Sequence, residues 1–295
     1  MNQFAVAPQD RPIWRKIVDF PLVAMVIALV LVVAALFATS RVLDMLPETM
    51  APAAQFVIRG FAAVLAGLLV YKLVVRHLGR QPHDDLPLAG ALSDTGLGLG
   101  VGAMLFSTVV GVAAVVGAYR ILGMGGWSDF VEIVMATGVV AGFTEELILR
   151  GIIFRWLEEL AGSAIALALS SLLFGFLHAM NPNATLFSSI AIALEAGILL
   201  GGAYMLTRSL WLAIGIHAGW NITQGFIWGV PVSGFEFEGL VQGQLYGPAW
   251  KSGGAFGLEA SVIALVIAGG AGLWLVWQAR KEGRWVAPMW SRREG

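Results

Sequence analysis

Long apolar stretches alternate with short polar segments along most of the chain. Reading each stretch of about 20 apolar residues as a membrane-spanning helix predicts eight helices, at roughly 20–39, 53–75, 97–119, 130–155, 163–180, 186–206, 210–229 and 257–279. The apolar core of the first stretch is longer than the roughly 7 to 15 residues of a signal peptide, which favours a retained span. The pattern therefore predicts an all-α, polytopic integral membrane protein with a core helical bundle.

Composition agrees with this fold class. Hydrophobic residues make up 58% of the chain and charged residues only 13%, whereas a soluble domain carries about 25% charged residues. The net charge of −1 gives no reason to expect a nucleic-acid partner. The absence of cysteine from the sequence excludes a disulfide framework, a thiolate metal site and a cysteine nucleophile.

The placement of lysine and arginine predicts the orientation, because cytoplasmic loops are enriched in them. With the N-terminus inside, most of the 18 basic residues fall on the cytoplasmic side, among them Arg11, Arg150, Arg155 and Arg293. The predicted outer loops hold only Arg41, Arg120 and Lys251, and Arg59 lies within the second span. We therefore expect both termini to be cytoplasmic, which requires an even number of spans.

Three segments follow from these elements. Residues 1–125 contain an N-terminal cytoplasmic tail and the first three helices, and residues 126–230 contain helices four to seven. Residues 231–295 contain an outer loop, the last helix and a basic cytoplasmic tail. The outer loop either covers a site or merely connects two helices.

One of the predicted core helices carries two adjacent acids and an arginine. Ionisable residues in hydrocarbon are costly and usually mark function. Glu146 and Arg150 are four residues apart, with the acid first, which favours an ion pair on one helix face. Glu145 is rotated by about 100° and is left to point elsewhere. A purely structural ion-pair cluster explains this helix equally well.

Two further core helices carry histidines. His178 shares a helix face with Phe174, and His217 shares one with Asn221. Taken alone, a membrane histidine is more often a packing residue than a catalyst. Together, a carboxylate, two imidazoles and an amide can deprotonate a water and stabilise an oxyanion. Glu145, His178 and His217 can alternatively hold a divalent metal such as zinc, with water in the fourth position.

The predicted spans leave one geometric conflict and one further buried acid. His178 lies about 22 Å along its helix from Ser163, whereas Glu145 lies about 15 Å from Arg155, so the spans must be offset or tilted if these residues are to meet. Glu195 shares a face with Leu199. It either lines a substrate cavity or forms an interhelical hydrogen bond.

These residues form an ordered set of motifs. Glu145, Glu146 and Arg150 fit E-E-x-x-x-R, Phe174 and His178 fit F-x-x-x-H, and His217 and Asn221 fit H-x-x-x-N. In this order the chain resembles, over roughly residues 130–230, the CPBP intramembrane protease family, which includes type II CAAX prenyl endopeptidases and bacterial Abi proteins. The resemblance makes residues 126–230 the expected catalytic core.

The resemblance implies a role for each motif residue. Glu145 with His178 would activate the attacking water, His217 with Asn221 would bind the oxyanion, and Glu146, Arg150 and Phe174 would support the site. Family members have been described both as metalloproteases and as metal-independent enzymes. The implied substrate is a membrane-associated peptide or protein, and the implied location is a bacterial inner membrane.

Two other function classes fit parts of the pattern. A noncatalytic membrane scaffold or bacteriocin-immunity protein would keep the polar cluster for folding. An ion-coupled transporter would use Glu145, Glu195 and the histidines to relay protons. The intact motif residues favour the enzyme over the scaffold, and the sequence contains no evident internal repeat of the kind that marks many transporters.

Overall fold

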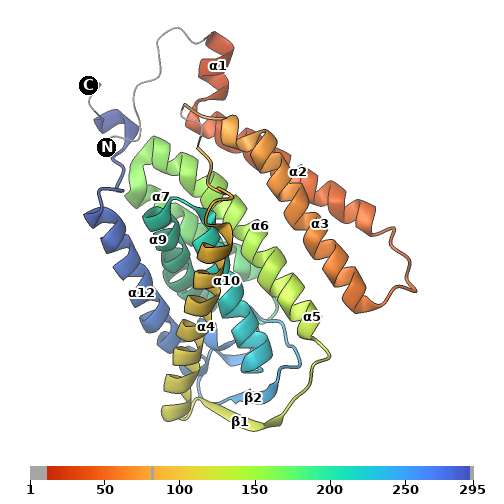
Figure 1. The fold of residues 1–295 in the computed structure, drawn as a ribbon. Helices are drawn as coiled ribbons and strands as arrows, with labels where there is room; N and C mark the ends of the chain where they lie inside the picture. Colours follow the sequence, from red (N-terminus) through yellow and green to blue (C-terminus); the bar gives the residue numbers. More distant parts are fainter. Residues whose placement is uncertain (1–11, 81–82, 293–295) are drawn as a thin grey trace.

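The computed structural model describes residues 12–80 and 83–292. Arg11 and Arg293, which were assigned above to the cytoplasmic side, lie outside these ranges. The prediction of an all-α polytopic protein is confirmed (Figure 1). The helices are α1 Ile13–Val18, α2 Pro21–Leu43, α3 Pro52–Leu73, α4 Ala91–Val115, α5 Phe130–Glu132, α6 Ala141–Ile148, α7 Arg155–Leu177, α8 Leu186–Ile192, α9 Ile198–Thr207, α10 Leu210–Ile222, α11 Ala249–Ser252 and α12 Val262–Lys281.

Four π-helical segments join or extend these helices without a loop: Ile133–Val140, Leu149–Phe154, Ala193–Gly197 and Thr223–Ile227. Such segments are rare and often occur at functional sites. Two of them flank α6, which carries Glu145 and Glu146, and a third contains Glu195. Arg150 and Glu195 therefore lie in segments with unusual backbone, and Glu145 and Glu146 lie between two such segments.

Within the described ranges, six helical runs are long and apolar enough to cross a membrane. One of them, Phe130–Met180, has 51 residues and corresponds to two of the predicted spans. The predicted span at 210–229 corresponds to α10 and the π-helical turn after it, which lie almost wholly inside the bundle. All eight predicted apolar stretches are thus helical, although α10 is not among the six runs.

The long run folds back on itself at Gly162. This glycine has φ 82° and ψ 167°, a conformation that costs glycine little, and a methyl group there would lie 2.8 Å from the Val286 carbonyl oxygen. Twelve residues before the break and twelve after it, the guanidinium of Arg150 lies 4.8 Å from the centre of the Phe174 ring. A straight helix would separate these residues by about 36 Å, so the chain forms a helical hairpin.

The position of this break corrects the predicted boundary at residue 155. The first arm extends to Ala161, so Glu145 lies about 25 Å and His178 about 24 Å along the helix from Gly162. The two residues therefore lie at similar depth, and the conflict seen in the predicted spans disappears. Arg150, which we expected on the cytoplasmic side, is instead fully buried inside the bundle.

Glycines fix the central helix α10 against α4. A methyl group on Gly219 would lie 2.3 Å from the Leu99 carbonyl oxygen, and one on Gly102 would lie 2.2 Å from that of Ile216. Only glycine permits this backbone approach, which is a common way of packing helices in membranes. The close contact holds His217, in the middle of α10, at a defined position in the bundle.

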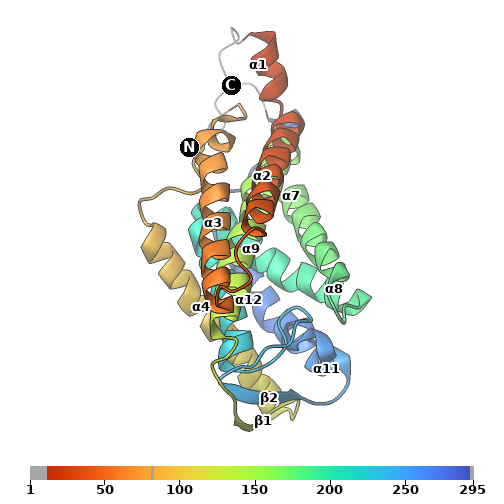
Figure 2. The same ribbon diagram turned by 90° about the vertical axis from the view of Figure 1, so that its right-hand side faces the viewer.

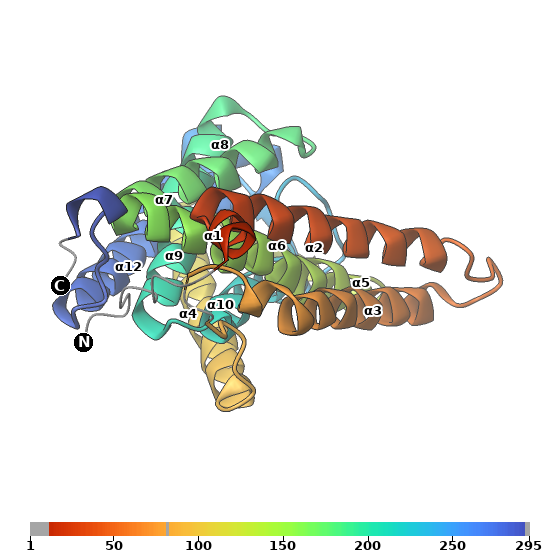
Figure 3. The same ribbon diagram turned by 90° about the horizontal axis from the view of Figure 1, so that it is seen from above.

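The remaining elements surround this core. Helices α2 and α3 form a hairpin that lies along the outside of the segment containing α5 and α6 (Figures 1 and 3). Helix α8 crosses the direction of its neighbours (Figure 2). Strands β1 Tyr119–Met124 and β2 Val241–Leu245 pair antiparallel, with Tyr119 opposite Leu245. This ribbon and α11 lie at the end of the molecule opposite α1 (Figure 2).

Candidate functional site

The predicted ion pair of α6 is present and has a third member. Arg150 Nη1 donates to Glu146 Oε1 at 2.8 Å, and Arg150 Nη2 donates to the carbonyl oxygens of Ala196 and Gly197 at 3.3 and 3.2 Å. His217 Nδ1 lies 3.1 Å from the same Glu146 oxygen. Because an ionised carboxylate can only accept hydrogen bonds, Nδ1 of His217 carries the donated proton. Glu146 therefore orients the imidazole of His217, and Arg150 orients Glu146.

His178 has the same proton at Nδ1 but a different partner. Its Nδ1 lies 2.8 Å from the Phe174 carbonyl oxygen, which can only accept. The rings of Phe174 and His178 are 4.7 Å apart, and those of Phe174 and His217 are 5.9 Å apart. In its neutral form, His178 thus has a free lone pair at Nε2. Phe174 therefore packs near both imidazoles, and its backbone carbonyl fixes the orientation of His178.

Glu145 is the less buried acid of the pair. Its side chain is 37% exposed, and its Oε2 lies 4.0 Å from His217 Nε2. No hydrogen bond joins Glu145 to His178 in the described part of the chain, but both line one cavity of about 470 Å³ together with Asn181. This cavity leaves room for a water between the carboxylate and the imidazole.

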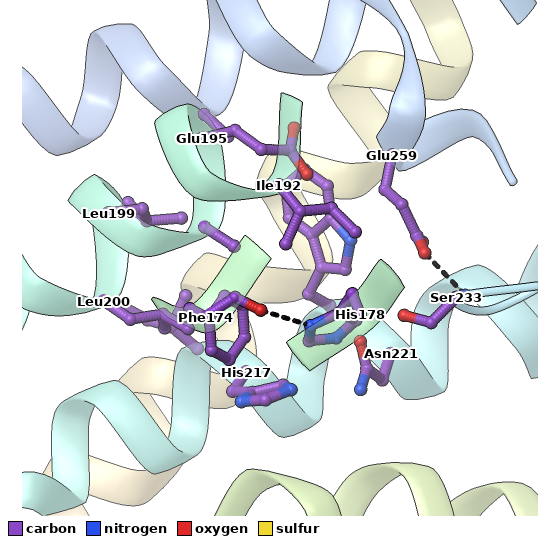
Figure 4. Close-up of a pocket in the computed structure, with 14 residues that line it drawn as sticks. Phe174, His178, Ile192, Glu195, Leu199, Leu200, His217, Asn221, Ser233 and Glu259 are labelled. Atoms are coloured by element: carbon purple, nitrogen blue, oxygen red, sulfur yellow. Dashed lines mark hydrogen bonds between the residues drawn. The ribbon is translucent and has the colours of Figure 1, made fainter. Parts of the chain in front are cut away.

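Asn221 lies beside the histidines but does not bind His217. Its Nδ2 donates to the Thr137 carbonyl oxygen at 2.9 Å, across from α10 to the π-helical segment before α6. Asn221, His178 and His217 line a second cavity of about 450 Å³ (Figure 4). His178 thus lines both cavities, whereas Asn221 lines the second.

The expected metal ligands do not form a metal site in this arrangement. Among the residues described, no group of three or more His, Asp and Glu side chains is arranged to hold a metal ion. The Nδ1 atoms of His178 and His217 are both engaged, by a carbonyl and a carboxylate respectively, so only Nε2 of each ring is left to bind a metal. Because Glu145, His178 and His217 do not converge on one point, they do not fit zinc in this geometry.

Three polar residues that line the second cavity come from outside the motifs. Glu195 comes from the π-helical segment between α8 and α9. It lines the cavity, which was one of the two alternatives that the sequence left open. Ser233 and Glu259, from the segment between α10 and α12, line it as well. The predicted outer loop therefore contributes to the wall of the site. No motif or periodicity marked Ser233 or Glu259, because their positions depend on how an irregular segment folds back.

Comparison with known proteins agrees with the motif residues. Residues 127–223 match the family model described as type II CAAX prenyl endopeptidase Rce1-like. The matched segment contains every motif residue discussed above, from Glu145 to Asn221, and the predicted resemblance is confirmed. Searches of curated proteins and of solved structures gave no match.

Proposed function

We propose, from the assignment of residues 127–223 to the type II CAAX prenyl endopeptidase Rce1-like family, that this chain hydrolyses a peptide bond of a membrane-associated peptide or protein by means of an activated water. The activity of this family is that of a CAAX-type intramembrane protease. The observation that carries the proposal is the different hydrogen bonding of the two histidines. His178 is arranged to accept a proton, whereas His217, beside two carboxylates, is arranged to donate a hydrogen bond.

His178 and Glu145 are suited to activate the water. With Nδ1–H bound to the Phe174 carbonyl, His178 offers the lone pair of Nε2 to the cavity that Glu145 also lines. A water held there would lose a proton to this pair while its oxygen attacks the scissile carbonyl carbon. The same pair would later return the proton to the leaving amine nitrogen as the C–N bond breaks. General base catalysis of this kind contributes about 10²- to 10⁴-fold.

His217 and Asn221 are suited to stabilise the oxyanion. His217 already donates Nδ1–H to Glu146, so it can also donate from Nε2 only when it is protonated to the imidazolium. The carboxylates of Glu145 and Glu146 stabilise this cation. Asn221 lies one turn further along the same helix and faces the same cavity. Its amide, now bound to Thr137, would add a second donor after a small side-chain rotation.

The cellular setting follows from the same family and from the charge pattern. The chain is an integral membrane protein, and we propose the bacterial inner membrane, with both termini cytoplasmic. In this orientation the end that carries α1 faces the cytoplasm, and the β1–β2 ribbon lies on the opposite side (Figure 1).

Cleavage by the purified protein in detergent tests the proposal. A library of membrane-anchored peptides, with products mapped by mass spectrometry, would be incubated with the wild type and with Glu145→Ala, His178→Ala and His217→Ala. We expect each substitution to lower kcat/KM by at least about 10²-fold. Glu236→Gln, which changes an exposed acid of the outer loop, serves as the matched control. Full activity in the three site variants would refute the assignment.

Chelation separates this mechanism from a metal-dependent one. Because the described side chains do not converge on a metal position, we expect activity to persist in phenanthroline. Inhibition that is reversed by added zinc would instead support a metal held by Glu145, His178 and His217 after rearrangement.

A further inference from the structure

The second cavity extends beyond the groups that the proposed reaction uses. His217 and Asn221 occupy one side of it, and Glu195 and Glu259 occupy the opposite side (Figure 4). Aliphatic side chains, among them Ile192, Leu199 and Leu200, line the rest of the wall together with His178. The cavity therefore combines apolar walls with two carboxyl groups on the side away from His217 and Asn221 (Figure 4).

Glu195 has no partner within the described protein. The residue is 2% exposed, and its Oε2 forms no hydrogen bond. Buried polar groups are almost always hydrogen-bonded, and leaving one unpaired is costly. In Figure 4 its carboxyl group projects into the cavity rather than into a neighbouring helix. An acid kept under these conditions points to a ligand that supplies the missing donor.

Glu259 adds a second carboxyl group that the protein holds in place. It is 4% exposed, its Oε1 accepts a hydrogen bond from the backbone N–H of Ser233 at 2.5 Å, and its Oε2 accepts one from the Gln224 amide. No lysine or arginine lines the cavity, and neither acid forms an ion pair in the described ranges. Two acids thus share this cavity with no lysine or arginine side chain to balance them.

We propose that this cavity is a specificity subsite that binds a lysine or arginine side chain of the peptide substrate, with Glu195 as its acceptor and Glu259 as a fixed second acid. The aliphatic walls would pack against the methylene stem, while the cationic group would reach the acids.

The position of the subsite predicts where the basic residue lies in the substrate. The cavity is continuous from the acids to His217 and Asn221, which the proposed function assigns to the scissile carbonyl oxygen. The basic residue would therefore lie within a few residues of the cleaved bond. This inference rests on the proposed function for its place in the reaction, but binding of the cation can be measured without catalysis.

A binding experiment tests the subsite alone. The full chain in detergent would be titrated calorimetrically with Nα-acetyl-lysine N-methylamide and with Nα-acetyl-norleucine N-methylamide, which has a similar stem but no charge. We expect the lysine probe to bind roughly tenfold more tightly. Glu195→Gln should remove this preference, and the control Glu236→Gln should keep it. Equal binding of the two probes by the wild type would overturn the proposal, as would an unchanged preference in Glu195→Gln.

A cleavage experiment tests the place of the subsite in the reaction. Peptides carrying lysine, norleucine or glutamate near the bond that the wild type cleaves would be compared by kcat/KM. We expect a lysine-to-norleucine ratio of about ten in the wild type and about one in Glu195→Gln. Cleavage without any lysine preference would overturn the subsite and leave the protease assignment intact. Glu195-dependent binding without any cleavage would do the reverse.

Discussion

Asp85 and Glu195 are both buried carboxyl groups, yet their surroundings differ in every respect. Asp85, in the loop between α3 and α4, accepts hydrogen bonds from the hydroxyls of Tyr71 and Tyr204, each at 2.7 Å, and pairs with Arg155 at 2.9 Å. Glu195, near the candidate catalytic residues, has no bonded partner in the described chain. The carboxylate of Asp85 is fully engaged in contacts that hold the fold together, whereas that of Glu195 can still accept a hydrogen bond.

This difference separates two uses of charge in one membrane protein. The Asp85 cluster joins α3, the following loop, α7 and α9, so its energy supports the architecture. Glu195 makes no such contribution, because its Oε2 has no hydrogen-bond partner in the described chain. Glu146 lies between these cases: its Oε1 is shared by Arg150 and His217, whereas its Oε2 has no partner. Of these three acids, the fully hydrogen-bonded one supports the fold, and the two with an unpartnered oxygen lie at the candidate site.

The largest expected effect comes from the candidate base. Glu145→Gln keeps the size of the side chain but removes the carboxylate that faces the water cavity, so activity should fall by about 10²- to 10⁴-fold. Because Glu145 is partly exposed and its one ion-pair contact in the described chain, with His217, is as long as 4.0 Å, thermal stability in detergent should change little. A large loss of stability with this substitution would indicate that Glu145, like Asp85, supports the fold.

Asp85→Asn should show the opposite pattern. It leaves Arg155 without its charge partner in a buried position, and breaking a buried pair costs about 3 to 5 kcal/mol. Thermal unfolding should shift strongly, while the activity of the protein that remains folded should be nearly normal. Tyr71→Phe, which removes one hydroxyl from the cluster, should give a smaller shift. Unaltered stability in Asp85→Asn would contradict a structural role.

Glu195→Leu should have a stability effect of opposite sign. Replacing an unpaired buried acid by an apolar side chain removes a desolvation penalty of about 1 to 3 kcal/mol, so the protein should become more stable while it loses lysine preference. Stability and function often oppose each other in this way. Destabilisation comparable to that of Asp85→Asn would indicate that Glu195 serves the fold.

The smallest expected effect concerns Asp84, next to Asp85 but near the surface. Partial burial acts to raise the pKa of Asp84, but hydrogen bonds from Lys72 Nζ and the Leu86 N–H outweigh it and lower the pKa below its usual value. Its stabilising contribution is therefore present above the unfolded-state pKa of about 3.9 and is lost as pH falls through the lower folded-state value. Asp84→Asn should lower stability near neutral pH by about 0.5 kcal/mol and flatten the acid limb of a pH–stability profile.

Periodicity within single helices predicted most of the features that depend on neighbouring residues in the sequence. The eight helical stretches, the pairing of Glu146 with Arg150 and the separate direction of Glu145 all follow from spacing within one helix. The two arms of the hairpin were predicted as separate spans, but the first was ended too early, at residue 155, because an apolar run contains no signal for a single residue of unusual φ such as Gly162. Arg150 was misplaced because the positive-inside pattern cannot tell a loop arginine from one neutralised inside the bundle.

Contacts between distant segments were beyond the sequence pattern. The bond between His217 and Glu146 joins residues 71 positions apart, and Glu259 reaches the cavity through an irregular segment held by Ser233 and Gln224. Thr137 binds Asn221 through its backbone carbonyl, which any residue type could supply. Such contacts depend on packing and on folded loops rather than on periodicity.

The glycine contact between α4 and α10 has a consequence for how the molecule tolerates change. Since the two backbones touch at Gly102 and Gly219, α10 has no clearance in which to slide or turn, and the imidazole it carries is set in advance of any substrate. A single added methyl group on this seam would displace His217 from Glu146 without altering either residue. Some of the positions that most constrain the chemistry of this protein are therefore ones that carry no side chain at all.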